Sequence, residues 1–131
     1  MFFRIETSNG LAIYEQIVRQ VKFAVAGEAL KTGDLVPSVR ELSRDLAVNP
    51  NTVARAYREL QGEGILAPVR GTGLEVTTQA EKRCTAERVH LIRERLRSVL
   101  QEARRSRLDL AEIRALLDEE LARLEKKVKA P

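Results

Sequence analysis

Four polar side chains that can hydrogen-bond to nucleic-acid bases lie within seven residues: Asn49, Asn51, Thr52 and Arg55. A guanidinium can donate two hydrogen bonds to guanine, an amide can pair with adenine, and a threonine methyl can touch the methyl group of thymine. We expect all four on the early, outward positions of one helix, which meet base edges when a helix enters the major groove. The set could therefore discriminate between base pairs.

Residues suited to catalysis or metal binding do not gather in this sequence. Cys84 is the only cysteine and His90 the only histidine, and their spacing puts them on different faces of a helix. We find no glycine-rich phosphate loop, carboxylate pair or Ser-His-Asp set. We therefore expect no enzyme, no metal site and no cofactor, with His90 at the surface.

Size and composition indicate one small globular domain or two very small ones. The 131 residues are 44% hydrophobic, 32% charged and 4% aromatic, and a chain of this length needs no disulfide or metal to fold. A single cysteine fits a reducing compartment, and no apolar stretch at the N-terminus is long enough for a signal peptide or a membrane span. We expect a cytoplasmic protein with no membrane partner.

The net charge of +4 is unevenly placed along the chain. Residues 1–78 carry nine basic and nine acidic side chains, so the whole excess lies in residues 79–131. Nine basic and four acidic side chains fall within residues 81–107. A solvated helix surface explains this run as easily as DNA does, and we favour the surface. Any argument for nucleic-acid binding must rest on motifs.

Two short helices joined by a tight turn are predicted in the first half of the chain. The first begins at Ser38, an N-cap residue that forms a capping box with Glu41. The next begins at Asn49, another N-cap residue, with Pro50 in the first helical position, and Gly62 marks its end. This arrangement is a helix-turn-helix.

Further elements flank the helix-turn-helix on both sides. Apolar residues at helical spacing predict a helix over residues 13–25, with Gly27 expected as a left-handed cap. Residues 65–69 and 74–77 read as two strands around a glycine-rich turn at 70–73. The hairpin would form the wing of a winged helix-turn-helix.

Only helix signals follow Thr78, because no glycine or proline occurs between residues 79 and 130. Asp109 and Glu112 form a second capping signature, which favours two helices with a break near 105–109; one long helix is the alternative. An apolar stripe runs along this region and must be buried against something. Its members are Val89, Ile92, Leu96, Val99, Ala103, Leu110, Ile113, Leu117, Leu121 and Leu124.

Several runs, in order and with the right spacing, resemble the GntR family of bacterial transcription regulators over residues 2–78. The Asn-Pro-Asn-Thr-Val run and the short C-terminal extension are similar to its YtrA subfamily. The matching runs are Tyr14-Glu15-Gln16-Ile17, Gly33-Asp34, Pro37-Ser38-Val39-Arg40-Glu41-Leu42 and Val48-Asn49-Pro50-Asn51-Thr52-Val53-Ala54-Arg55-Ala56-Tyr57-Arg58-Glu59-Leu60.

The resemblance implies a mainly α fold, with a winged helix-turn-helix DNA-binding domain in residues 1–78 and a two-helix dimerisation region in residues 79–131. It implies a homodimeric repressor that binds a palindromic double-stranded operator on the bacterial nucleoid, with the apolar stripe as dimer interface. YtrA-like regulators are often encoded beside ABC transporter genes, which implies such an operon as target. The expected DNA contacts are Ser38, Arg40, Asn49, Asn51, Thr52, Arg55, Arg58, Arg70, Gly71 and Gly73.

Three positions depart from the family pattern. Ala47 stands where a glycine is common, and it bears a backbone cost if a positive φ is required. In the wing, Thr72 replaces a cation and Glu75 replaces an aromatic residue. Both wing changes weaken an electrostatic contact, so Arg70 and the glycine backbone are expected to carry it.

Two residues have a second interpretation each. The ring of Tyr57 is assigned to the core, although its hydroxyl could reach the DNA backbone. Arg44 could contact a phosphate, or it could pair with Glu41 or Asp45 on the surface. For the whole chain, the competing hypothesis is a winged-helix module that binds a partner protein through its basic helix. A small apolar effector between the terminal helices is a third hypothesis, for which the sequence marks no pocket.

Overall fold

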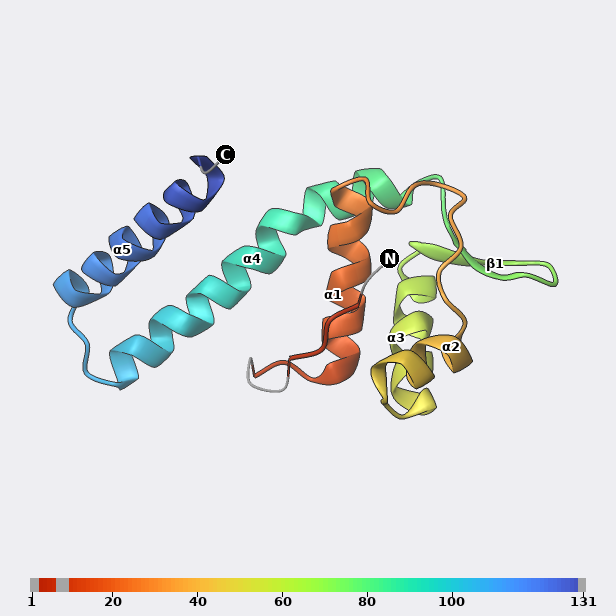
Figure 1. The fold of residues 1–131 in the computed structure, drawn as a ribbon, viewed down its shortest axis with the longest axis horizontal. Coiled ribbons are helices and arrows are strands. Elements are labelled where there is room, and N and C mark those ends of the chain that lie inside the picture. The colour runs from red at the N-terminus through yellow and green to blue at the C-terminus, as the bar shows by residue number, and fades with distance from the viewer. Residues whose placement is uncertain (1–2, 7–9, 130–131) are drawn as a thin grey trace. The chain divides into compact units, whose positions relative to one another are not determined.

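The computed structural model describes residues 3–6 and 10–129 (Figure 1). The chain divides into two compact units, Met1–Val89 and His90–Pro131. The fold is mainly helical, with one two-stranded sheet among the described residues, and the predicted winged helix-turn-helix is confirmed. None of the described helices is long and apolar enough to cross a membrane.

Helix α1 (Ile13–Ala26) is the central helix of the first unit. Its stripe of Ile17, Val21 and Val25 is fully buried, as the helical spacing predicts. The expected left-handed cap at Gly27 is wrong: Gly27 has φ −88°, and the positive φ falls on Glu28 at 63°. The reason is that the Gly27 N–H still donates to the Phe23 carbonyl at 2.9 Å, so the helical turn continues for one more residue.

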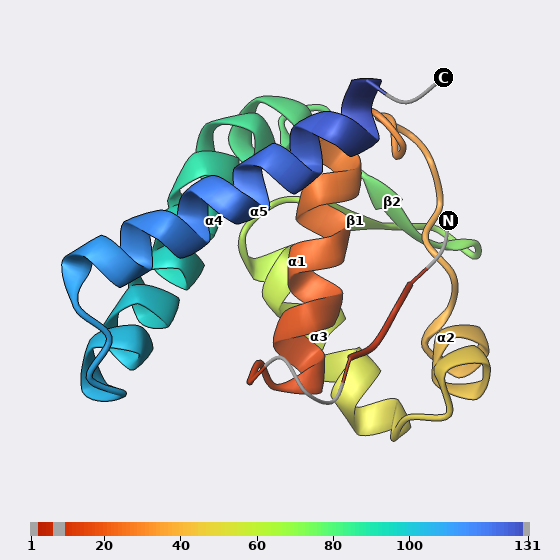
Figure 2. The ribbon, with the colours of Figure 1, turned by 60° about the vertical axis from the view of Figure 1, so that its left-hand side comes forward.

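Helices α2 (Val39–Leu46) and α3 (Pro50–Gly62) form the helix-turn-helix. The Ser38 hydroxyl accepts a hydrogen bond from the Glu41 N–H at 3.0 Å, so the predicted N-cap is confirmed. Ala47 ends α2 in the left-handed region, with φ 54° and ψ 44°. An alanine therefore adopts the conformation that the family's glycine adopts at lower cost. In Figures 1 and 2 the start of α3 lies beside α2.

Strands β1 (Leu66–Val69) and β2 (Gly73–Val76) pair antiparallel and form the predicted hairpin. A third segment that the sequence did not signal joins them, because Leu35 forms an isolated bridge with Glu75. The N–H of Val36 donates to the Leu74 carbonyl at 3.0 Å. The loop before α2 is thus tied to the wing.

The core of the first unit lies between α1, α3 and the sheet. Helices α1 and α3 lie next to each other in Figure 1 and are in contact, and Ile17, Val53 and Leu60 have no solvent exposure. Among the described residues no buried side-chain nitrogen or oxygen lacks a hydrogen-bond partner. A closely packed core in which the buried polar side chains are hydrogen-bonded holds the helix-turn-helix rigid.

The start of helix α4 (Ala80–Arg105) also belongs to the first unit. Ala80 and Cys84 are buried in its core. The compact unit therefore extends to Val89, beyond the predicted boundary at residue 78. The resemblance to the GntR family places all of this helix in the second region, residues 79–131.

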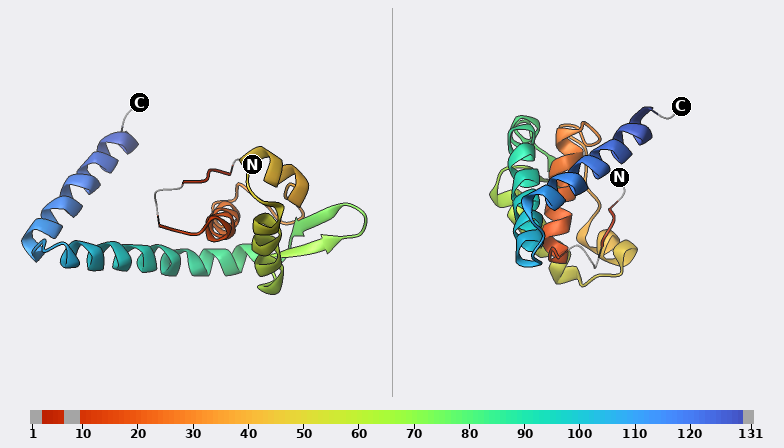
Figure 3. Two further views of the ribbon diagram at one scale, coloured as in Figure 1. Left: turned by 90° about the horizontal axis from the view of Figure 1, so that it is seen from below. Right: turned by 90° about the vertical axis from the view of Figure 1, so that its left-hand side faces the viewer.

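The second unit holds the rest of α4 and helix α5 (Leu110–Lys129). The predicted break is confirmed: Arg107 has φ 67°, and a turn separates the two helices (Figure 3). Asp109 and Glu112 form a reciprocal capping box, with Glu112 N–H to Asp109 Oδ1 at 2.8 Å and Asp109 N–H to Glu112 Oε1 at 3.3 Å. The chain after Thr78 therefore forms two helices rather than one long helix.

Candidate nucleic-acid interface

The first turn of α3 presents short polar side chains to solvent. Asn49 caps the helix: its Oδ1 accepts from the Asn51 N–H at 2.8 Å. That bond occupies one oxygen and leaves the Asn49 amide NH₂ available as a donor. Asn51 is exposed and Thr52 is half-buried. The start of α3 therefore offers amide and hydroxyl groups at a helix N-terminus, where a free N–H and the helix dipole also favour anions.

Arg55 lies one turn further along α3, and its guanidinium is held by an aromatic ring. Its Cζ lies 3.7 Å from the centroid of the Tyr14 ring on α1, which is a close cation–π contact. The Tyr14 hydroxyl in turn donates to Glu15 Oε1 at 3.2 Å. Arg55 is exposed, so its guanidinium edge remains open to a ligand while its face is covered. Arg58, on the next turn, is also exposed.

The first turn of α2 presents Ser38 and Arg40, both exposed. Because the Ser38 hydroxyl accepts the Glu41 N–H, it can still donate its own proton outward. Arg44 lies 3.8 Å from Asp45 Oδ1, so the surface-pair interpretation describes its position in this structure. An exposed pair of this length contributes little to stability.

Tyr57 lies in the core, as predicted. Its hydroxyl donates to the Pro37 carbonyl at 2.7 Å and so ties α3 to the loop that precedes α2. Burial, with a smaller effect of the Glu41 charge, raises the pKa of this phenol far above its usual value. In this structure the hydroxyl is committed to the protein backbone rather than turned toward a ligand.

The wing turn is built on glycines that a larger residue could not replace without strain. Gly71 has φ +75° and Gly73 φ +119°, and an added Cβ would meet nothing within 4 Å at either, so conformation and not space requires them. The Thr72 hydroxyl donates to the Arg70 carbonyl at 3.1 Å. Arg70 is exposed at the start of this turn.

The apolar stripe predicted for dimerisation is largely exposed to solvent. Ile113 is buried and Ala103 is half-buried. His90 is at the surface, as expected, where its Nε2 lies 3.4 Å from Glu94 Oε1. The exposed members of the stripe are Val89, Ile92, Leu96, Val99, Leu110, Leu117, Leu121 and Leu124.

The contacts of three residues in the first unit were not predicted from the sequence. Tyr14 could not be found as the partner of Arg55, because nothing local connects two residues so far apart in the chain. Leu35 carried no strand signal. The position of Lys22 did indicate a contact, because this residue falls on the buried stripe of α1, where a lysine requires carboxylate partners.

Within residues 3–6 and 10–129, no group of histidine, cysteine, aspartate or glutamate side chains could hold a metal ion.

A family model described as bacterial regulatory proteins, gntR family, matches residues 13–76. The HTH-type transcriptional repressor YtrA of Bacillus subtilis (strain 168) is 34% identical over 116 residues, which cover 88% of this chain and 89% of that protein.

Two solved structures are similar over most of the chain. A GntR family transcriptional regulator from Listeria monocytogenes gives a TM-score of 0.63 at 32% identity, covering 88% of this chain and 98% of the other. YtrA from Sulfolobus acidocaldarius, a GntR-family transcription factor, gives a TM-score of 0.55 at 29% identity, covering 93% and 98%.

Proposed function

This chain belongs to the GntR family of bacterial regulatory proteins, and on that premise we propose that it acts as a homodimeric repressor on a palindromic operator. It is a DNA-binding transcription regulator and not an enzyme.

The dimer proposal is supported by the exposed apolar stripe along α4 and α5. Side chains such as Ile92, Leu121 and Leu124 are each more than half exposed. A contiguous row of large apolar side chains is unfavourable in water, and burial against an identical row removes it from solvent on both chains at once. The three- and four-residue spacing is that of helices that pack along their length. A second copy of this chain is therefore the proposed occupant.

For DNA, we assign base contacts to the start of α3 and phosphate contacts to the start of α2. Asn51 and Thr52 lie in the first turn of α3, which enters the major groove in helix-turn-helix proteins. Asn49 contributes its free amide NH₂, and Arg55 contributes the edge of a guanidinium whose face is held by Tyr14. The remaining contacts are assigned to Ser38, Arg40, Arg58, Arg70 and the glycine backbone at 71 and 73.

A symmetric dimer presents two copies of α3, so the operator should itself be two-fold symmetric. In dimeric helix-turn-helix proteins the two half-sites lie about one helical turn, 34–36 Å, or a multiple of it apart. The operator we propose is therefore a palindrome read once by each chain. The proposed target is an ABC transporter operon, on the resemblance to the YtrA subfamily, and the proposed place of action is the bacterial nucleoid.

Selection of bound sequences from a random DNA pool tests this proposal. The full chain is used at about 150 mM salt, where non-specific phosphate binding is already weakened. Recovery of a two-fold symmetric site supports a dimeric sequence reader and provides the operator for a genome search. Recovery of no motif by folded, dimeric protein would contradict the proposal as stated, and would favour an effector requirement or the protein-interaction hypothesis.

A further inference from the structure

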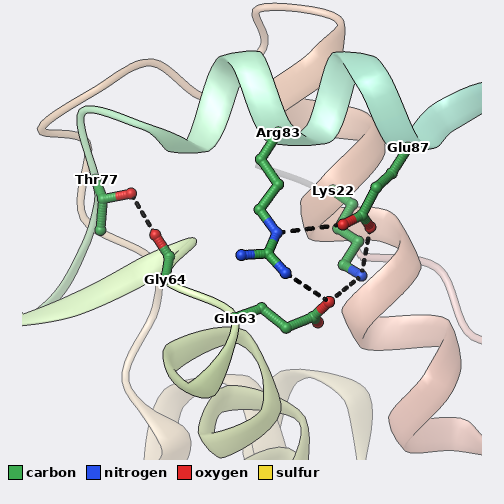
Figure 4. Close-up of polar contacts among 6 residues, drawn as sticks. All are labelled: Lys22, Glu63, Gly64, Thr77, Arg83 and Glu87. Atoms are coloured by element: carbon green, nitrogen blue, oxygen red, sulfur yellow. Dashed lines mark hydrogen bonds and ion pairs between the residues drawn. The ribbon is translucent and has the colours of Figure 1, made fainter.

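Four charged side chains from three helices meet at one place in the first unit, and we call them the charge cluster: Lys22, Glu63, Arg83 and Glu87 (Figure 4). Lys22 Nζ lies 3.0 Å from Glu63 Oε1 and 3.0 Å from Glu87 Oε2. Arg83 Nε lies 3.2 Å from Glu87 Oε1, and its Nη2 lies 4.0 Å from Glu63 Oε1. Each carboxylate thus contacts both cations, and the four groups close a ring.

Lys22 is the most deeply placed member of the charge cluster. Its side chain is only 8% exposed, against 27% for Glu63 and 29% for Glu87. Burial by itself lowers the pKa of the Lys22 ammonium, but the hydrogen bonds and charges of Glu87 and Glu63 outweigh it, and the pKa is raised. Burial likewise acts to raise the pKa of Glu87, yet Lys22 and Arg83 lower it. Both groups therefore stay charged at neutral pH.

The charge cluster lies where α3 ends and α4 begins. Glu63 is the C-cap residue of α3, and Arg83 and Glu87 are on the first two turns of α4. Lys22, from α1, bridges the two. This junction joins the helix that we assign to DNA to the helix that carries the start of the dimer stripe.

A second set of contacts fixes the same junction from the wing side. The Thr77 hydroxyl donates to the Gly64 carbonyl at 2.6 Å (Figure 4). The Thr77 N–H donates to the Ile65 carbonyl at 3.0 Å. Gly64 has φ +76°, and a Cβ there would lie 3.1 Å from Gln79 Nε2. The chain on both sides of the wing is thus held close, with little space for the end of α3 and the start of α4 to slide.

We propose that Lys22 is a positioning residue that holds the first two turns of α4 at one angle to the end of α3 within the first unit, and thereby sets the preferred spacing of the two operator half-sites. This inference rests on the proposed function, since it requires two DNA-binding units joined through their α4 helices. Apolar packing alone tolerates sliding between helices, whereas a ring of ion pairs is satisfied in one arrangement. The ring therefore acts on geometry more than on net stability.

The length of α3 determines how strongly DNA binding depends on the angle between α3 and the start of α4. The helix has 13 residues, so the proposed base-contacting end lies roughly 20 Å from the charge cluster at 1.5 Å per residue. A tilt of about 10° at the cluster would move that end by roughly 3.5 Å. That displacement equals about one base-pair step of 3.4 Å. A loosened junction should therefore tolerate half-sites one base pair closer or further apart.

The test measures spacing preference directly. Duplexes carry two copies of the half-site recovered by selection, separated by a graded series of spacers, and compete for the full-length chain. The wild type is expected to favour one spacing. Lys22→Met keeps the stem of the side chain and removes its charge; we expect about tenfold weaker binding at that spacing. Neighbouring spacings should then fall within about threefold of it, with unchanged sequence preference inside each half-site.

Two matched controls separate positioning from general effects. Lys31→Met removes one positive charge at an exposed position and should keep the wild-type spacing profile at slightly lower affinity. Val25→Ala destabilises the core of α1 while leaving all four charged side chains of the charge cluster in place, and it should also keep the profile. Relaxed spacing in Val25→Ala equal to that in Lys22→Met would overturn the positioning role. If Lys22→Met does not fold, Glu87→Gln takes its place with the same expectation.

Failure of this inference can be told from failure of the proposed function. One outcome is that the wild type strongly favours one spacing and folded Lys22→Met gives the same profile. This result overturns the role of Lys22 and leaves the proposal of a dimeric sequence reader intact. Wild-type protein that binds a single half-site as tightly as a pair overturns the dimeric reader and the inference with it. A relaxed profile in Lys22→Met, with both controls unchanged, supports both.

Discussion

Replacing Leu121 by aspartate should break the dimer. Leu121 is 58% exposed in the single chain, and full burial of a leucine contributes about 1.5–3 kcal/mol. The area still to be buried on pairing is then worth about 1–2 kcal/mol per chain, and roughly twice that in a symmetric dimer, before the added cost of burying a carboxylate. At 1.4 kcal/mol per tenfold, the dimer dissociation constant should rise by at least about 30-fold.

Sedimentation equilibrium of the full-length chain measures this constant. Ala115→Asp is the matched control: it introduces the same carboxylate into α5 at an exposed position on the face opposite the stripe. The control should dimerise like the wild type, and both variants should retain wild-type helical content by circular dichroism. A dissociation constant for Leu121→Asp no higher than that of the control would refute the assignment of the stripe to the dimer.

Three further predictions concern DNA and pH. Asn51→Ala should weaken operator binding about 5- to 150-fold, corresponding to about 1–3 kcal/mol for a base contact; fluorescence anisotropy measures it, and unchanged affinity would remove Asn51 from the interface. Arg70→Ala should lower the slope of log affinity against log salt by about 1, since one phosphate contact is lost; an unchanged slope would exclude that contact. Burial, followed by the charge of Glu87, raises the pKa of the Cys84 thiol from 9.0 to about 11. The stability gained from the neutral thiol is then complete below pH 9 and lost as pH rises to 11, by up to about 2–3 kcal/mol. Urea unfolding between about pH 8 and pH 11 should therefore show a shallower decline for Cys84→Ala than for the wild type, and equal slopes would contradict the burial argument.

Helix boundaries were predictable where a side chain acts on backbone only two or three residues away. Ser38 and Asn49 both cap the helices assigned to them, and Asp109 with Glu112 marks the start of α5. Such contacts need no knowledge of the fold, because the donor and the acceptor are close in sequence. The prediction of a left-handed cap at Gly27 was wrong because a more local backbone contact decided the conformation. The residue type indicated a left-handed conformation, but the backbone hydrogen bonding carried the helical turn one residue further.

Contacts between distant residues were not predictable from the sequence. Tyr14 and Arg55 meet only because α1 packs on α3. The partners of Lys22 come from the end of α3 and from α4. Its place on the buried stripe of α1 signalled that partners must exist, without naming them.

The first two turns of α4 illustrate the limit of periodicity. Helical spacing continues through residues 80–105, so the sequence gives no sign that the helix passes from one compact unit to the next. Burial of Cys84 and pairing of Glu87 place these turns with the winged unit. These two turns of α4 therefore belong to the first compact unit.

The stoichiometry of the complex on the selected operator tests the central claim most directly. Sedimentation velocity of the full-length chain, at 14.8 kDa, with a duplex that carries the selected site gives the number of chains bound. Two chains per symmetric duplex, with loss of that complex when one half-site is scrambled, is the predicted result. A complex of one chain per duplex, or equal binding to intact and scrambled sites, would contradict a dimeric reader of a palindrome.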